Sequence, residues 1–288
     1  MWDAIFTLGN GYQFGYGLPV KIKQFKLSGN KNATDVWHVQ DAVNRSDLFG
    51  LSDFEGRTIE FELRARDTDM FAAFEQFRQA WEHPFAPGEE TTLAWNMEDG
   101  STCMVYGRPS GLEIGDADRS FGNTLLDGAA KFKCSDQLIY RPGSGGQVTC
   151  TSARGYGEWG FYTNFTSPLY AYGTKEALAN PATVEVTGSM PVPFTVRFYG
   201  PVDTPCLEAD GLRLPLRSGM SSGWWIEVDT RTGKVTDQDG RAAYEFIDPA
   251  VNIRGLRLKP GRTDVKLNVG AGTGTNTAKA VITWQSAL

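Results

Sequence analysis

The last hundred residues alternate short apolar and polar strands with tight turns, and this pattern constrains the fold more than any other feature of the chain. Ile226 and Val228 alternate with acidic neighbours, which is the period of two that half-buries a strand. Pairs such as Asp239-Gly240 separate the strands, because glycine tolerates a positive φ. The pattern predicts an antiparallel β scaffold in which no catalytic group stands apart.

The length of the chain, 288 residues, favours two domains over one. A short segment rich in Gly and Ser, residues 141–146, is the best candidate linker because strand-like sequence flanks it on both sides. We therefore expect a first domain at 1–142 and a second domain at 143–288. The second domain is expected to be almost entirely β.

The first domain combines strands with one amphipathic helix. Alternating apolar residues predict a strand over 58–65, and the spacing of Met70, Phe74, Phe77 and Trp81 predicts a helix over 68–82. Further strands are expected at 91–95, 103–107 and 125–132. An apolar stripe on a helix beside strands must be buried, so we interpret it as core packing and not as a cofactor slot.

Three connections carry their own expectations. Residues 30–44 and 115–123 form long loops in this interpretation, and loops of this length inside a compact domain usually serve binding. They are candidate contact arms, although disordered surface is an equal alternative for each. The glycine-rich residues 270–274 lack the Gly-Lys-Ser/Thr of a phosphate-binding loop and are interpreted as the tip of a hairpin.

Composition and charge exclude several classes of function. A net charge of −6 with no basic stripe argues against sequence-independent clamping of DNA or RNA, which needs clustered Lys and Arg, and no specific nucleic-acid binding is expected either. No apolar run approaches the ~18 residues that a membrane span requires. The N-terminus shows no basic segment ahead of an apolar one, so we expect synthesis in a cytoplasm. The four cysteines are scattered and are expected to be buried thiols.

No motif assigns a catalytic, cofactor-binding or metal-binding residue. His38 and His83 are the two histidines, and no nucleophile-elbow motif accompanies either of them. The glycines around Gly9 and Gly11 precede a strand-like segment and not a helix, so no dinucleotide loop is expected there. The sequence therefore predicts a protein without enzymatic activity, without a cofactor and without a metal.

One cluster of aromatic residues supports an alternative function. Trp159, Trp224 and Trp225 could stack on the rings of a glycan if they were exposed on a β-sandwich. Adjacent side chains in a strand point to opposite faces, so one of Trp224 and Trp225 is expected in the core while the other could be exposed.

Several segments resemble a known family in their order and spacing. In the first half they are 47–53, 56–63, the single helix that follows, and 134–140; in the second half they are 180–183, 200–201, 225–230, 239–240, 258–261 and 278–284. With these segments the chain resembles the distal tail proteins, or minor tail proteins, of long-tailed phages with non-contractile tails (siphophages). The resemblance extends over most of the chain.

The resemblance implies a mainly β fold, with a tail-tube-like β-sandwich carrying one helix and then a galectin-like β-sandwich. It also implies a homohexameric ring at the tip of the phage tail, in the virion, around the DNA channel. The implied partners are the tail tube protein, the tail hub or tail-associated protein, and the tape measure protein. A ring is a closed heterologous assembly, so each subunit must present two different complementary edges.

These expectations lead to one main interpretation with two rivals. The main one is a structural, non-enzymatic component of a phage tail tip. The first rival is a carbohydrate-binding module that attaches to host cell-wall glycan through the tryptophans. The second is a glycoside hydrolase appendage, which needs two carboxylates within ~10 Å of each other in a cleft.

Overall fold

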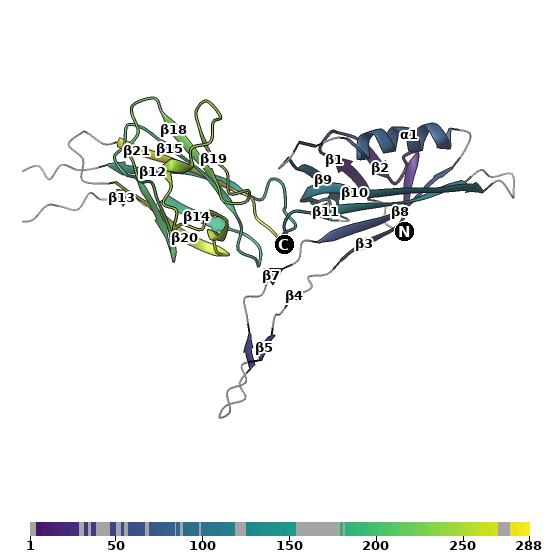
Figure 1. The fold of residues 1–288 in the computed structure, drawn as a ribbon, viewed down its shortest axis with the longest axis horizontal. Helices are drawn as coiled ribbons and strands as arrows, with labels where there is room; N and C mark the ends of the chain where they lie inside the picture. The colour runs from purple at the N-terminus through teal and green to yellow at the C-terminus, as the bar shows by residue number, and fades with distance from the viewer. Residues whose placement is uncertain are drawn as a thin grey trace, which may run out of the picture. The chain divides into compact units, whose positions relative to one another are not determined.

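The protein is mainly β, as predicted, and its chain divides into two compact units, Met1–Arg141 and Pro142–Leu288. The computed structural model describes residues 4–28, 32–33, 36–38, 47–49, 53–54, 57–66, 69–83, 85–86, 89–97, 99–118, 125–153, 179–180, 182–269 and 277–288. Figure 1 shows the single described α-helix lying over strands of the first unit.

The first unit is built on one seven-stranded antiparallel sheet in the order β2-β1-β9-β10-β11-β8-β3. Its strands are β1 (Ile5–Leu8), β2 (Gln13–Gly15), β3 (Val20–Leu27), β8 (Thr58–Arg66), β9 (Thr91–Asn96), β10 (Thr102–Asp118) and β11 (Leu125–Cys134). Phe6 on β1 packs edge-on against Phe61 on β8 with ring centroids 5.1 Å apart. Those strands are four places apart in the sheet, so the sheet must curl to bring its apolar face together.

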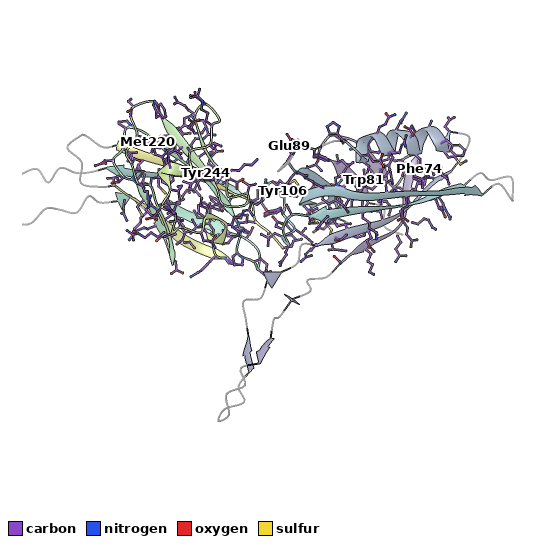
Figure 2. The ribbon with its side chains drawn as sticks, in the orientation of Figure 1. Phe74, Trp81, Glu89, Tyr106, Met220 and Tyr244 are labelled. Carbon is purple, nitrogen blue, oxygen red and sulfur yellow. The ribbon has the colours of Figure 1, made fainter. Side chains whose placement is uncertain are left out.

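Helix α1 (Met70–Trp81) confirms the helix predicted from the apolar spacing. The stripe faces the sheet: Phe77 packs on Phe14 at 5.2 Å and Trp81 on Phe61 at 6.1 Å between ring centroids. Figure 2 labels Phe74 and Trp81 on this side of the helix. Gly128 on β11 permits the approach, because a Cβ there would lie 3.0 Å from the Phe74 ring. The helix therefore closes the core, as expected.

The two expected contact loops are wrong in part, because both contain strands. Strand β10 continues to Asp118 and pairs with β11 as far as Leu125, so 115–118 is one side of a long hairpin. In the stretch 30–44, β4 (Asn32–Ala33) pairs with β7 (Asp53–Phe54), and β5 (Val36–His38) pairs with β6 (Asp47–Phe49). The remaining residues of both predicted loops, apart from those in strands, lie outside the described residues.

The second unit is a β-sandwich of a six-stranded and a four-stranded sheet. The first has the order β13-β12-β21-β15-β18-β19 and the second the order β14-β20-β16-β17. The strands of the six-stranded sheet are β12 (Gly146–Ala153), β13 (Ala179–Asn180), β15 (Phe194–Tyr199), β18 (Trp225–Asp229), β19 (Val235–Asp237) and β21 (Thr277–Trp284). Those of the four-stranded sheet are β14 (Ala182–Val186), β16 (Cys206–Ala209), β17 (Leu212–Pro215) and β20 (Gly261–Asn268). Two 3-10 turns, Tyr244–Phe246 and Ile253–Gly255, lie among them.

The core of the sandwich follows the predicted alternation. Ile226 and Val228 on β18, and Val265 and Leu267 on β20, are fully buried. Thr230 is one of two buried polar residues among the described residues, the other being Ser286. The Thr230 hydroxyl accepts from the backbone N–H of Phe194 and donates to the carbonyl of Phe194, both at 2.9 Å, so its burial leaves no unpaired group.

The predicted hairpin tip at 270–274 lies outside the described residues. The strands on its two sides belong to different sheets, because β20 pairs with β14 and β16, whereas β21 pairs with β12 and β15. By contrast, Gly240 has a φ of +75°, as the turn chemistry predicts. None of the helices in the described ranges is long and apolar enough to cross a membrane.

Candidate assembly and binding surfaces

The hairpin of β10 and β11 gives the first unit an unpaired strand edge. β9 pairs with β10 only from Thr102 to Gly107, and beyond that point β10 pairs with β11 alone among the described residues. The indole N–H of Trp81 donates a hydrogen bond to the backbone carbonyl of Gly111 at 3.1 Å, so this carbonyl of β10 has a partner. Ile114, further along, is 41% exposed. Unpaired backbone groups beside an exposed apolar side chain suit pairing with another strand.

Strand β3 stands at the end of the same sheet and provides a different edge. It pairs with β8, and no second strand is hydrogen-bonded to it among the described residues, although β2 lies near it. Its exposed side chains include Lys21, Lys23 and Lys26, and its register shifts between Ile22 and Gln24. Lysines and irregular register are the devices that limit indiscriminate strand addition. The two edges therefore differ in charge and in regularity.

A charged cluster fixes the outer face beside β3. The guanidinium of Arg64 donates two hydrogen bonds to Asp127, at 2.7 and 2.8 Å, and the ammonium of Lys23 donates a third at 3.3 Å. The hydrogen bond from Arg64 is the main cause that lowers the pKa of Asp127 from 3.8 to about 2, with Lys23 adding to it. The cluster ties β3, β8 and β11 together on the face opposite the core.

In the second unit, one outward row crosses the six-stranded sheet. Lys279 on β21 stands opposite Tyr199 on β15, and Tyr199 stands opposite Trp225 on β18. One register step away on the same face, Arg197 stands opposite Glu227. We call these five residues the sheet platform. Their strand neighbours Phe198, Ile226 and Ala280 are buried, so the platform side chains face away from the core.

The platform residues hold one another in place. The guanidinium of Arg197 lies 4.2 Å from the centre of the Trp225 ring and donates two hydrogen bonds to Glu227, at 2.9 and 2.6 Å. The ammonium of Lys279 lies 5.2 Å from the centre of the Tyr199 ring. Burial lowers the pKa of Arg197, but its hydrogen bonds to Glu227 and Tyr199 outweigh that effect and raise it. The two aromatic rings are therefore oriented before any ligand arrives.

The predicted glycan-stacking residues are placed differently from one another. Trp159 lies outside the described residues. Trp224 precedes β18 in a turn and is 41% exposed, whereas Trp225 is partly buried on the outward face. The expectation that one of the adjacent tryptophans lies in the core is therefore wrong. Strand β18 begins at Trp225, so the alternation of inward and outward side chains along the strand does not extend to Trp224. Of the two described tryptophans of this set, only Trp225 belongs to the platform.

Sequence reasoning missed Arg197, Tyr199 and Lys279. The alternation of Phe194–Tyr199 does indicate that Arg197 and Tyr199 share a face. What it does not indicate is which strands flank β15, because β18 and β21 are distant in the chain. The platform depends on that pairing.

The cysteines offer no reactive site. Cys103, Cys134 and Cys150 are buried, Cys206 is partly buried, and all four are free thiols. Burial raises the pKa of Cys134 to about 12 and that of Cys150 to about 11, so the nucleophilic thiolate is suppressed. Within the described ranges, no group of three or more His, Cys, Asp or Glu side chains could hold a metal ion.

Comparisons with known proteins find likeness in structure and not in sequence. No protein-family model and no curated protein sequence matches the chain. SPP1 Dit (gp 19.1), described as a paradigm of the hub adsorption apparatus in phages that infect Gram-positive bacteria, has the same fold with a TM-score of 0.56 and 14% identity. A chain of the phage P2 baseplate in its activated conformation gives a TM-score of 0.50 and 10% identity. Each likeness covers 98% of this chain and 98% of the other chain. These structural neighbours are phage tail hub and baseplate proteins.

Proposed function

We propose that this protein is a non-enzymatic structural component of the tail tip of a siphophage. It forms a homohexameric ring that joins the tail tube to the tail hub and receptor-binding apparatus around the DNA channel. The observation that carries the proposal is the shared fold with SPP1 Dit over 98% of both chains. The protein is assembled in the host cytoplasm and resides in the virion.

The strand edges of the first unit support a ring. A closed heterologous ring needs two unlike surfaces on each subunit. The β10 edge beyond Gly107 offers unpaired backbone and the apolar Ile114, whereas β3 offers a lysine-bearing edge. The ring would stack against the tail tube protein on one side and the hub or tail-associated protein on the other. The tape measure protein and the DNA pass through its centre.

The direct test is native mass spectrometry of the purified chain together with negative-stain microscopy, alone and after mixing with tail tubes of the phage that encodes it. The expected result is a six-subunit species with a central hole, formed alone or at the tube end. A strict monomer that also fails to bind the tube ends contradicts the proposal. The measurement with added tail tubes is needed because a subunit can require the tube end as a template before the ring closes.

A second candidate function is attachment to host cell-wall glycan by the second unit. The specific observation that favours it is the sheet platform, where two oriented aromatic rings share a face with charged hydrogen-bonding groups. Aromatic rings combined with a polar handle are common in recognition surfaces. Binding on a glycan array that is lost on a platform Trp→Ala substitution supports this function, and no binding to any glycan contradicts it.

A further inference from the structure

We infer that the sheet platform binds a phosphate-bearing glycan, with Trp225 and Tyr199 as the ring-stacking surface and Lys279 as the phosphate contact. This inference rests on the second candidate function and is independent of the ring. The ligand is a phosphate-bearing glycan, and the residues that contact it are Trp225, Tyr199 and Lys279.

The dimensions of the row fit an oligosaccharide. Thr151 on β12, Lys279, Tyr199 and Trp225 stand opposite one another on four adjacent strands. With strands about 4.8 Å apart, the row is roughly 14 Å long, which is enough for two or three sugar rings. Thr151 and Lys279 are exposed, and Tyr199 and Trp225 are partly exposed. A chain of sugars can therefore lie across the strands and contact each position.

The rings provide the stacking surface without a large ordering cost. Trp225 is held by Arg197, which is itself held by Glu227. A side chain that is already fixed loses little conformational entropy when a ligand binds. The indole presents its apolar carbon atoms beside guanidinium and carboxylate groups, which can donate to and accept from hydroxyl groups next to the stacked ring.

The charges of the platform select an anionic ligand. Glu227 neutralises Arg197, and among the described residues no carboxylate lies within ion-pair distance of Lys279. Among the described residues, the platform therefore carries one positive charge without an ion-pair partner, at the Tyr199 end. A ligand with a negative group at that point gains an attraction that a neutral glycan lacks.

The kind of cation indicates the kind of anion. Planar carboxylates are recognised best by the fork of an arginine, and here that fork is occupied by Glu227. A lysine ammonium is a point charge that binds phosphate without demanding a planar partner. The available cation, Lys279, therefore suits a phosphate group better than a uronic acid.

The test is an array of oligosaccharides of matched length that are neutral, uronic-acid-bearing or phosphate-bearing, probed with the full-length chain at two salt concentrations. The wild type is expected to bind the phosphate-bearing set most tightly and to lose that preference at high salt. Lys279→Gln should reduce phosphate-glycan binding about two- to five-fold and weaken neutral-glycan binding by a smaller factor. Trp225→Ala should weaken binding to all glycans about tenfold.

Trp224→Ala is the matched control, since Trp224 is an exposed neighbour outside the platform, and it should bind like the wild type. Thermal unfolding of each variant shows whether it is folded, and Lys279→Gln keeps the test decisive if Trp225→Ala is not. Equal binding of neutral and phosphate-bearing glycans, or a Lys279→Gln variant that behaves like the wild type, overturns the inference while leaving glycan attachment standing. No binding to any glycan overturns both.

Discussion

Asp127 is a described carboxylate of the first unit whose pKa is strongly lowered. Its carboxylate receives hydrogen bonds from Arg64 and Lys23, which lower its pKa from 3.8 to about 2. A carboxyl whose pKa is lower in the folded state contributes stability above its unfolded pKa and loses it as the pH falls through the folded pKa. The contribution of Asp127 should therefore be complete above pH ~5 and vanish between pH ~4 and ~2.

Asp127→Asn should accordingly lower the free energy of unfolding at pH 7 and not at pH 2. Because the Asp127 side chain is 46% exposed, solvent screening limits the loss to about 1 kcal/mol or less. Urea unfolding of both proteins at several pH values measures it, with Glu113→Gln on the neighbouring strand as the control. A difference that stays constant down to pH 2 would show that the cluster does not act through this charge.

Single residues also show where prediction from the sequence stops. The burial of Ile226 and Val228 follows from alternation, and the structure confirms it. The positions of Trp224 and Trp225 depend on which residue begins β18, and the sequence does not mark that boundary. The contact of Arg197 with Trp225 depends further on cross-strand register, which is set by tertiary pairing and not by local pattern.

Helix α1 is the element whose packing gives the sharpest prediction about stability. Phe77 is fully buried, with Phe14 at 5.2 Å and Trp81 at 5.1 Å between ring centroids. Phe77→Ala should cost about 3–5 kcal/mol of unfolding free energy, since it removes a large ring and leaves a cavity. Phe71 is the matched control on the same helix, because it is 54% exposed, and Phe71→Ala should change stability by less than about 0.5 kcal/mol. Equal effects in chemical denaturation would contradict the packing described for this face.

The β10–β11 hairpin gives a prediction about assembly, which rests on the proposed ring. Ile114→Lys places a charge on the unpaired part of β10, in the way that natural edge strands resist pairing. The variant should remain a folded monomer by circular dichroism and fail to form the six-subunit species in native mass spectrometry. Tyr244→Lys changes an exposed residue of the second unit, which is 52% exposed against 41% for Ile114, and should assemble normally. A ring formed by Ile114→Lys excludes this edge as a subunit contact.

The helix and the hairpin differ in how much of each the sequence could predict. The apolar residues of the helix recur with a clear helical period, and the apolar stripe that they form determines which face of the helix is buried. The far part of β10 contains Pro109, Gly111, Gly115 and Asp116, which are typical of turns, and the sequence predicts a loop at 115–123. These residues are tolerated because the strand has a free edge and because its register with β11 shifts after Pro109 and again after Ile114.

For the whole molecule, the sequence predicts the class of fold better than its assembly. A mainly β chain with one helix follows from local patterns, and the likeness to phage hub and baseplate proteins covers both units. Neither the number of subunits in a ring nor the ligand of a sheet face has a local signature, because both depend on surfaces that form only after distant strands pair. The edges of the first unit and the platform of the second are products of that pairing.

The division into two units gives the last prediction. The units Met1–Arg141 and Pro142–Leu288 are each of a size that supports a hydrophobic core, and each has its own buried cluster. Fragments 1–141 and 142–288 should therefore unfold cooperatively on their own, and their NMR spectra should together reproduce most of the spectrum of the whole chain. A cut after residue 98 is the matched control, since it separates β9 from its partner β10 and should leave the shorter piece unfolded. If fragment 1–141 or 142–288 fails to unfold cooperatively, then that core needs the other unit, and a substitution such as Phe77→Ala would destabilise the entire molecule instead of one half of it.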